Sequence, residues 1–69
     1  MTNLISTIAG NIQEINISVG DTITEDDEAM IIEAVKMETV VYGEQGTVME
    51  IFVSVGEAVE EGQTLAVVG

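Results

Sequence analysis

The sequence predicts an all-β domain, folded as a sandwich or a flattened barrel. Short apolar runs rich in β-branched residues alternate with turns built from Gly and acidic residues. No stretch shows the 3.6-residue period of an amphipathic helix. The chain also repeats itself at a shift of 36 residues. Two repeats are too few for a solenoid, so we expect the halves to pack together as one pseudo-symmetric domain spanning residues 1–69.

The repeat places Gly10–Ile32 over Gly46–Val68 without a gap. Seven pairs are identical, and they are Gly10/Gly46, Glu14/Glu50, Ile15/Ile51, Ser18/Ser54, Val19/Val55, Gly20/Gly56 and Glu25/Glu61. Apolar positions are kept in further pairs such as Ile23/Val59, so both halves are expected to use one backbone plan.

The first expected strand is Leu4–Ile8, at a sheet edge, followed by a turn at Gly10. A period-two alternation then predicts a strand over Ile15–Val19, with its second copy over Ile51–Val55. Ile12 and Val48 are each one residue out of phase with the run that follows. A bend or a β-bulge at the same place in both halves would explain this shift.

The remaining signals are turns and the strands that follow them. Turns are predicted at Gly20-Asp21 and Gly56-Glu57, and Ile23 and Val59 should pack singly against the core. Further turns are expected at Glu25–Asp27 and Glu61–Gln63, where Gly62 and Asp26 suit a positive φ. The last strands of the two halves are Ala29–Ala34 and Leu65–Val68.

Composition excludes several classes of function. Without Cys or His, the chain can form no disulfide, thiolate or imidazole metal site, and no His-based acid–base catalyst. Thirteen acidic residues and one basic residue give a net charge of −12, which disfavours binding to nucleic acid and anionic membranes. The charge either steers the domain toward a partner with a basic face or only keeps its surface soluble. No apolar run reaches membrane-spanning length and no basic signal region begins the chain, so the expected location is cytoplasmic. The acidic run Glu25–Glu28 lacks the spacing of a calcium loop, so no metal is expected.

Lys36 is the only side-chain amine of the chain. Ala29–Ile32 leads into it and Thr39–Tyr42 leads away, which places it on a turn between two strands. That turn joins the two halves, at the end of the domain opposite to Val68-Gly69. A single amine held at the tip of a hairpin is a place for covalent attachment.

The residues around Lys36 resemble the biotinyl/lipoyl attachment domain family. The resemblance is carried by Ile32-Glu33-Ala34-Val35-Lys36-Met37-Glu38-Thr39, by the turn Val19-Gly20-Asp21, and by Gly46-Thr47-Val48, Val55-Gly56-Glu57 and Glu61-Gly62, and it covers the whole chain. It implies a flattened β-barrel of two four-stranded sheets with quasi-two-fold symmetry (a barrel-sandwich hybrid). It also implies that the modified lysine, Lys36, lies on an exposed hairpin between the halves.

Two branches of that family differ beside the lysine. Biotin-carrying members usually show Ala-Met-Lys-Met, which Ala34-Val35-Lys36-Met37 matches except at Val35. Lipoyl members usually show Asp before the lysine and often Ala after it, and neither is present. The resemblance therefore favours biotin on Lys36, with lipoate as the alternative. Val35 is a poor residue for a two-residue hairpin turn with positive φ at both positions, so either the turn is of another type or it is strained.

The function implied by the resemblance is that of a non-catalytic biotin carrier. A biotin protein ligase would attach the biotin and would recognise Glu33, Ala34, Val35 and Met37. The partners would be a biotin carboxylase and a carboxyltransferase or decarboxylase, between which the biotin shuttles a carboxyl group. Two alternatives stay open, a lipoyl carrier of a 2-oxo acid dehydrogenase complex and an unmodified barrel used for assembly.

Overall fold

The computed structural model describes all 69 residues and contains eight strands. No helix of the length and apolarity needed to cross a membrane is present. The strands are β1 Thr2–Ile5, β2 Gly10–Ile15, β3 Thr22–Ile23, β4 Glu28–Ala34, β5 Met37–Tyr42, β6 Gly46–Ile51, β7 Ala58–Val59 and β8 Thr64–Val68.

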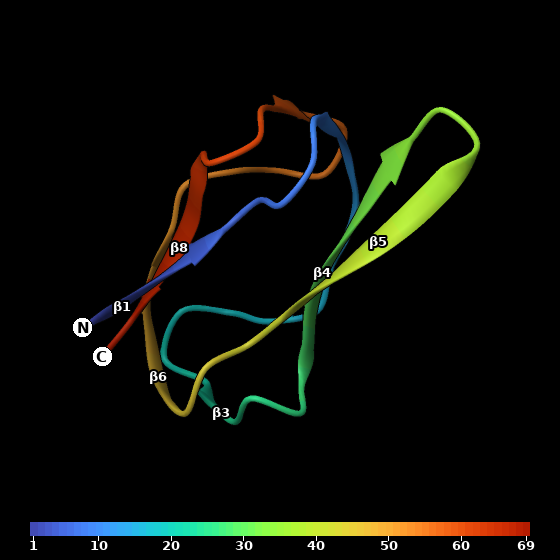
Figure 1. The fold of residues 1–69 in the computed structure, drawn as a ribbon. Helices are drawn as coiled ribbons and strands as arrows, with labels where there is room; N and C mark the ends of the chain where they lie inside the picture. The colour runs from blue at the N-terminus through green and yellow to red at the C-terminus, as the bar shows by residue number, and fades with distance from the viewer.

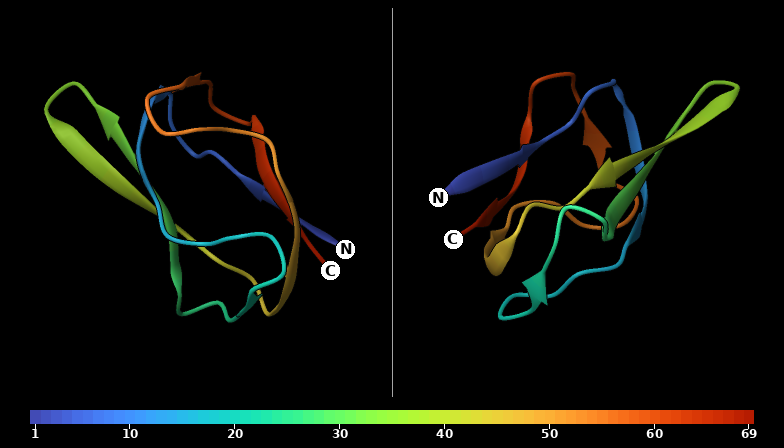
Figure 2. Two further views of the ribbon diagram at one scale, coloured as in Figure 1. Left: turned by 180° about the vertical axis from the view of Figure 1, so that it is seen from behind. Right: turned by 60° about the horizontal axis from the view of Figure 1, so that its bottom comes forward.

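These strands form two four-stranded sheets, in the orders β1-β8-β6-β3 and β5-β4-β2-β7. The sheets face each other across the core, and the amino and carboxyl termini lie side by side at one end (Figures 1 and 2). The all-β fold of two four-stranded sheets is therefore confirmed. Expected strand β1 lies at a sheet edge, but it ends at Ile5 and not at Ile8.

The internal symmetry includes every strand of the chain. A shift of 36 residues moves β2 onto β6, β3 onto β7 and β4 onto β8, and it brings β1 over β5. The same shift exchanges the two sheet orders. The repeat seen in the sequence from Gly10 onward thus begins at the first strand, where the side chains have diverged.

Hydrogen bonds between the halves follow the same symmetry. The Ile12 amide donates to the Glu57 carbonyl at 2.9 Å, and its counterpart, the Val48 amide, donates to the Asp21 carbonyl at 2.8 Å. Each half therefore supplies acceptors that the other half needs. Since an unpaired buried amide is costly, neither half is expected to be stable alone.

The predicted β-bulges are confirmed. The β2–β4 register shifts between Ile12 and Glu14, and the β6–β8 register shifts between Val48 and Glu50. The bulges turn Ile12 and Val48 inward, where both are fully buried. They account for the change of phase in the sequence.

Two expectations around β2 were wrong. Gly10 begins β2 and pairs with Val59, so it is not a turn. The strand also ends at Ile15 and does not continue to Val19. Ile17 is buried beyond the strand end, whereas Val19 is 62% exposed within a turn. The alternation of apolar residues correctly indicated that Ile17 is buried, but Ile17 does not belong to a β-strand.

The turns are partly as predicted. Gly20, Gly56 and Gly62 have positive φ, at 96°, 92° and 86°. Asp26 does not, although a side chain closes its turn just as one closes the Gly62 turn. The Thr24 amide donates to the Asp27 carboxylate at 2.8 Å, and the Glu60 amide donates to the Gln63 side-chain oxygen at 2.9 Å.

A core of 14 buried residues fills the space between the sheets. Met30 and Ile32 of β4 are fully buried there, and Ile23 and Val59 pack against it from their two-residue strands, as expected. Because β4 is anchored in this core, the hairpin that continues from it starts from a fixed base.

Candidate functional site: the hairpin around Lys36

Lys36 lies at the tip of the β4–β5 hairpin. The strands pair through Glu33 with Glu38 and through Ala34 with Met37, which leaves Val35 and Lys36 as the two turn residues. The hairpin projects beyond the rest of the domain, at the end opposite to both termini (Figure 1). The expected position of Lys36 is therefore confirmed.

The turn differs from the two-residue type with positive φ at both positions. Lys36 has a φ of 69° and is the only non-glycine residue of the chain with a positive φ, so Val35 does not share that conformation. This combination of signs is that of a type II turn and not of type I′. Val35 consequently avoids the crowding that its branched Cβ would meet. The strain lies at Lys36 itself and is on the order of 1–2 kcal/mol.

The side chains of the tip are accessible. Val35 is 88% exposed and Met37 is 55% exposed, and both Lys36 and Glu33 are exposed. Lys36 takes part in none of the side-chain hydrogen bonds of the structure. An unpartnered primary amine on a fixed, protruding turn fits an acyl group that is linked through an amide bond.

Charge around the tip is unbalanced. Glu33 and Glu38 lie directly opposite each other on the hairpin, and both are exposed. Like charges at such a cross-strand pair repel. Lys36 carries the only positive side chain of the chain, and it lies in the same hollow as both carboxylates. The ammonium group therefore offsets this repulsion while the lysine is unmodified.

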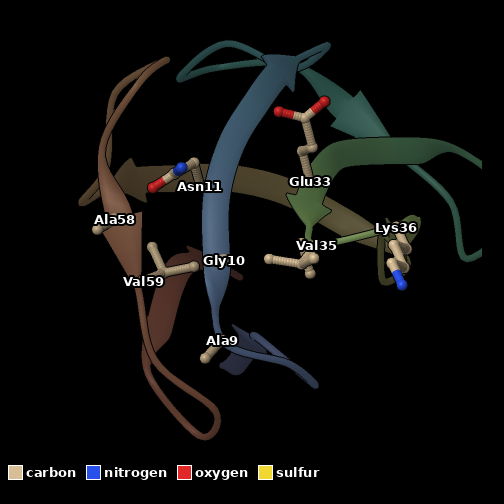
Figure 3. Close-up of a pocket in the computed structure, with 9 residues that line it drawn as sticks. Ala9, Gly10, Asn11, Glu33, Val35, Lys36, Ala58 and Val59 are labelled. Carbon is tan, nitrogen blue, oxygen red and sulfur yellow. The ribbon is translucent and has the colours of Figure 1, made fainter.

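A shallow groove runs beside the hairpin. Its lining is mainly apolar, from the side chains of Ala9, Ala34, Val35, Ala58 and Val59, and is completed by Gly10, Asn11, Glu33 and Lys36. In Figure 3, Val35 points across the groove toward Gly10, whereas the Lys36 side chain points away from that strand. Of the five residues singled out in the sequence, Val35 lines only this groove, and Met37 lines only the second hollow, the one that holds Glu38. Glu33, Ala34 and Lys36 line both.

The floor of the groove depends on Gly10. A Cβ built there would lie 2.5 Å from the Glu33 carbonyl oxygen and 2.9 Å from Ile32 Cγ2. Glycine therefore lets β2 approach β4 at the base of the hairpin. The sequence marked this position through the Gly10/Gly46 identity, but it gave no reason for it. Ala9, Asn11, Ala58 and Val59 carried no signal of a site, because only the fold brings them to Lys36.

The acidic turn at Glu25–Glu28 lies away from the hairpin, on the approach to β4. No three acidic side chains of the chain gather in a way that could hold a metal ion.

Comparison with known proteins identifies relatives of the whole chain. A family model described as "Biotin-requiring enzyme" matches residues 1–68. The biotin carboxyl carrier protein of Streptococcus mutans is 46% identical over 57 residues, which cover 81% of this chain and 44% of the relative. The chain thus spans less than half the length of that protein.

Two further relatives extend the comparison. The biotinylated protein TB7.3 homolog of Mycobacterium leprae is 36% identical over 62 residues, covering 88% of this chain and 87% of the relative. The crystal structure of Kluyveromyces lactis urea carboxylase contains a similar domain, with a TM-score of 0.87 and 35% identity, over 99% of this chain and 6% of that one.

Proposed function

We propose that this chain, which belongs to the family of biotin-requiring enzymes, is a carrier domain that holds biotin covalently on Lys36. The observation that carries the proposal is the placement of the only side-chain amine at the tip of an exposed, firmly based hairpin. The match of Ala34-Val35-Lys36-Met37 to the biotin branch supports biotin over lipoate.

Attachment is an acyl transfer to Lys36 Nζ. The neutral amine attacks the carbonyl carbon of an activated biotinyl adenylate, the C–N bond forms, and the bond from that carbon to the phosphate oxygen breaks to release AMP. The ammonium must lose one proton before attack and the amine a second one during it. With no His in the chain, the biotin protein ligase supplies the proton acceptor. The side-chain charge of Lys36 is lost, so the net charge falls from −12 to −13.

The rest of the hairpin presents this amine to the ligase. The fixed turn sets the direction of Lys36, while Glu33, Ala34, Val35 and Met37 offer the shape and charge that the ligase reads. Because these residues sit on paired strands and not on a free loop, little conformational entropy is lost on recognition.

The domain performs no chemistry of its own. Biotin, when bound, supplies a carboxyl group carrier between two partner active sites, those of a biotin carboxylase and a carboxyltransferase or decarboxylase. Tethering raises the local concentration of the carried group at both sites. The acidic surface would steer the domain toward basic faces of these partners, in the cytoplasm.

The test is the intact mass of the protein after co-expression with a biotin ligase and, separately, with a lipoyl ligase. We expect a full biotinyl increment that is absent from Lys36→Arg, with circular dichroism showing that the variant is folded. In the parent complex, Lys36→Arg should abolish carboxyl transfer. A lipoyl increment alone would move the domain to the 2-oxo acid dehydrogenase complexes, and no increment with either ligase would leave the unmodified barrel.

A further inference from the structure

We propose that the groove beside the hairpin is a resting site for the biotinyl group carried by Lys36. This inference rests on the proposed function, because it requires biotin at Lys36. It adds that the biotinyl group binds to its own domain, in the groove formed by β2, β7 and the hairpin turn.

The chemistry of the groove suits a biotinyl ring system. Ala9, Ala58 and Val59 present small apolar surfaces, which can cover the faces of a fused bicycle. Asn11 lines the same groove, its amide directed toward the Ala58 side in Figure 3, and it makes none of the side-chain hydrogen bonds of the chain. Its carbonyl and amino groups complement the N–H and C=O groups of a cyclic urea.

The tether identifies the occupant. Lys36 itself lines the groove, so any group on Nζ begins at its rim. A short flexible tether gives an effective concentration of about 1 mM or more, so a contact with a Kd of about 1 mM would be at least half occupied. No other ligand has this advantage.

The arm can reach the groove without rearrangement of the backbone. The Lys36 side chain points away from β2 in Figure 3, but it is exposed and unpartnered, so rotation of its four-carbon stem is free. Val35, already directed across the groove, would close over the seated ring. The active site of a partner enzyme would then compete with this groove for the biotinyl group.

The internal repeat supplies a matched control. Thr22 is the counterpart of Ala58 at a shift of 36 residues, and each is the exposed first residue of a two-residue strand. Gly69, after the end of β8, occupies the place of Glu33, so residues 1–69 place no counterpart of the β4–β5 hairpin beside Thr22. A substitution at Thr22 therefore reproduces the local change at Ala58 without touching the groove.

The experiment compares backbone amide chemical shifts of three forms: unmodified, acetylated at its amines with acetic anhydride, and biotinylated by the ligase. Acetylation removes the Lys36 charge without adding a ring. We expect Gly10, Asn11, Ala58 and Val59 to shift in the biotinylated form and not in the acetylated form.

Ala58→Glu should abolish these ring-dependent shifts at Gly10 and Asn11, whereas Thr22→Glu should retain them. Intact mass separates the two proposals: a missing biotinyl increment overturns the biotin function itself. A complete increment with groove amides that match those of the acetylated form overturns the resting site. Shifts that survive Ala58→Glu would also overturn it.

Discussion

Gly10 joins the stability of the domain to the position of its site, and Gly10→Ala tests that link. The added methyl group would lie 2.5 Å from the Glu33 carbonyl oxygen, a backbone atom in a paired strand. It cannot be accommodated by rotation of a side chain, so β2 and β4 must separate at the base of the hairpin.

The cost can be placed within limits. Overpacking of this kind destabilises by roughly 1–3 kcal/mol, and about 1 kcal/mol lowers Tm by roughly 4–8 °C in a domain of this size. Total stabilities of about 0.05–0.15 kcal/mol per residue leave the variant mostly folded in most of that range. We therefore expect Gly10→Ala to fold, to melt markedly lower, and to be biotinylated more slowly.

Gly46→Ala is the matched control. Its methyl group would meet the Gly69 carbonyl at the same 2.5 Å, and Gly46 has a φ of 147°, so a comparable loss of stability is expected. This strain lies at the termini, far from Lys36, and the rate of biotinylation should stay at the wild-type value. Urea unfolding and a ligase time course measure the two quantities. The reasoning fails if Gly10→Ala unfolds within about 0.5 kcal/mol of wild type, or if both variants are biotinylated equally slowly.

Three further predictions concern the turn and the chain ends. Lys36→Gly should be about 1 kcal/mol more stable than Lys36→Ala by thermal melting, because only glycine relieves the positive φ; equal melting would show that the turn is unstrained. Val35→Met should change stability by less than about 0.5 kcal/mol and should reach the same biotinyl increment, because Val35 is 88% exposed with no positive φ. At a shift of 36 residues, Gly69 is the counterpart of Glu33 and Met1 is the counterpart of Met37, so an Ala-Val-Lys linker from Gly69 to Met1 copies the hairpin turn at residues 34–36. Closing the chain in this way should raise the free energy of unfolding by up to about 4 kcal/mol, because it lowers the entropy of the unfolded chain. A lower Tm for the cyclised chain would refute the structural equivalence of the termini and the hairpin.

Much of the fold could be predicted because its signals are local. The alternation of apolar residues, the glycines at the turns and the 36-residue repeat together indicated the sheets, the bulges and the hairpin. The same signals failed at Ile15–Val19, because burial of Ile17 does not require it to belong to a ladder. They also failed at Asp26, which does not take the positive φ that Gly62 has in the second half.

The sequence predicted the part of the site that is continuous in the chain, but not the residues that other strands bring beside it. Lys36 was found because a single amine between two short strands is visible in the sequence, and its neighbours were named through the resemblance to the biotinyl/lipoyl attachment family. Ala58 and Val59 come from the other half of the repeat, and their place beside Val35 depends on how the halves interlock.

The sequence by itself determined an all-β duplicated domain with one attachable amine at the joint of its halves. Tertiary structure alone decided that Lys36, and not Val35, is the turn residue with a positive φ. It also decided that β4 approaches β2 closely at Gly10 and that a groove lies beside the hairpin. The reason is physical. Residue patterns record which side chains are buried. They do not specify a single backbone dihedral, such as the φ of Lys36 within its own hairpin, or a close approach between strands distant in the chain, such as that of β2 and β4 at Gly10.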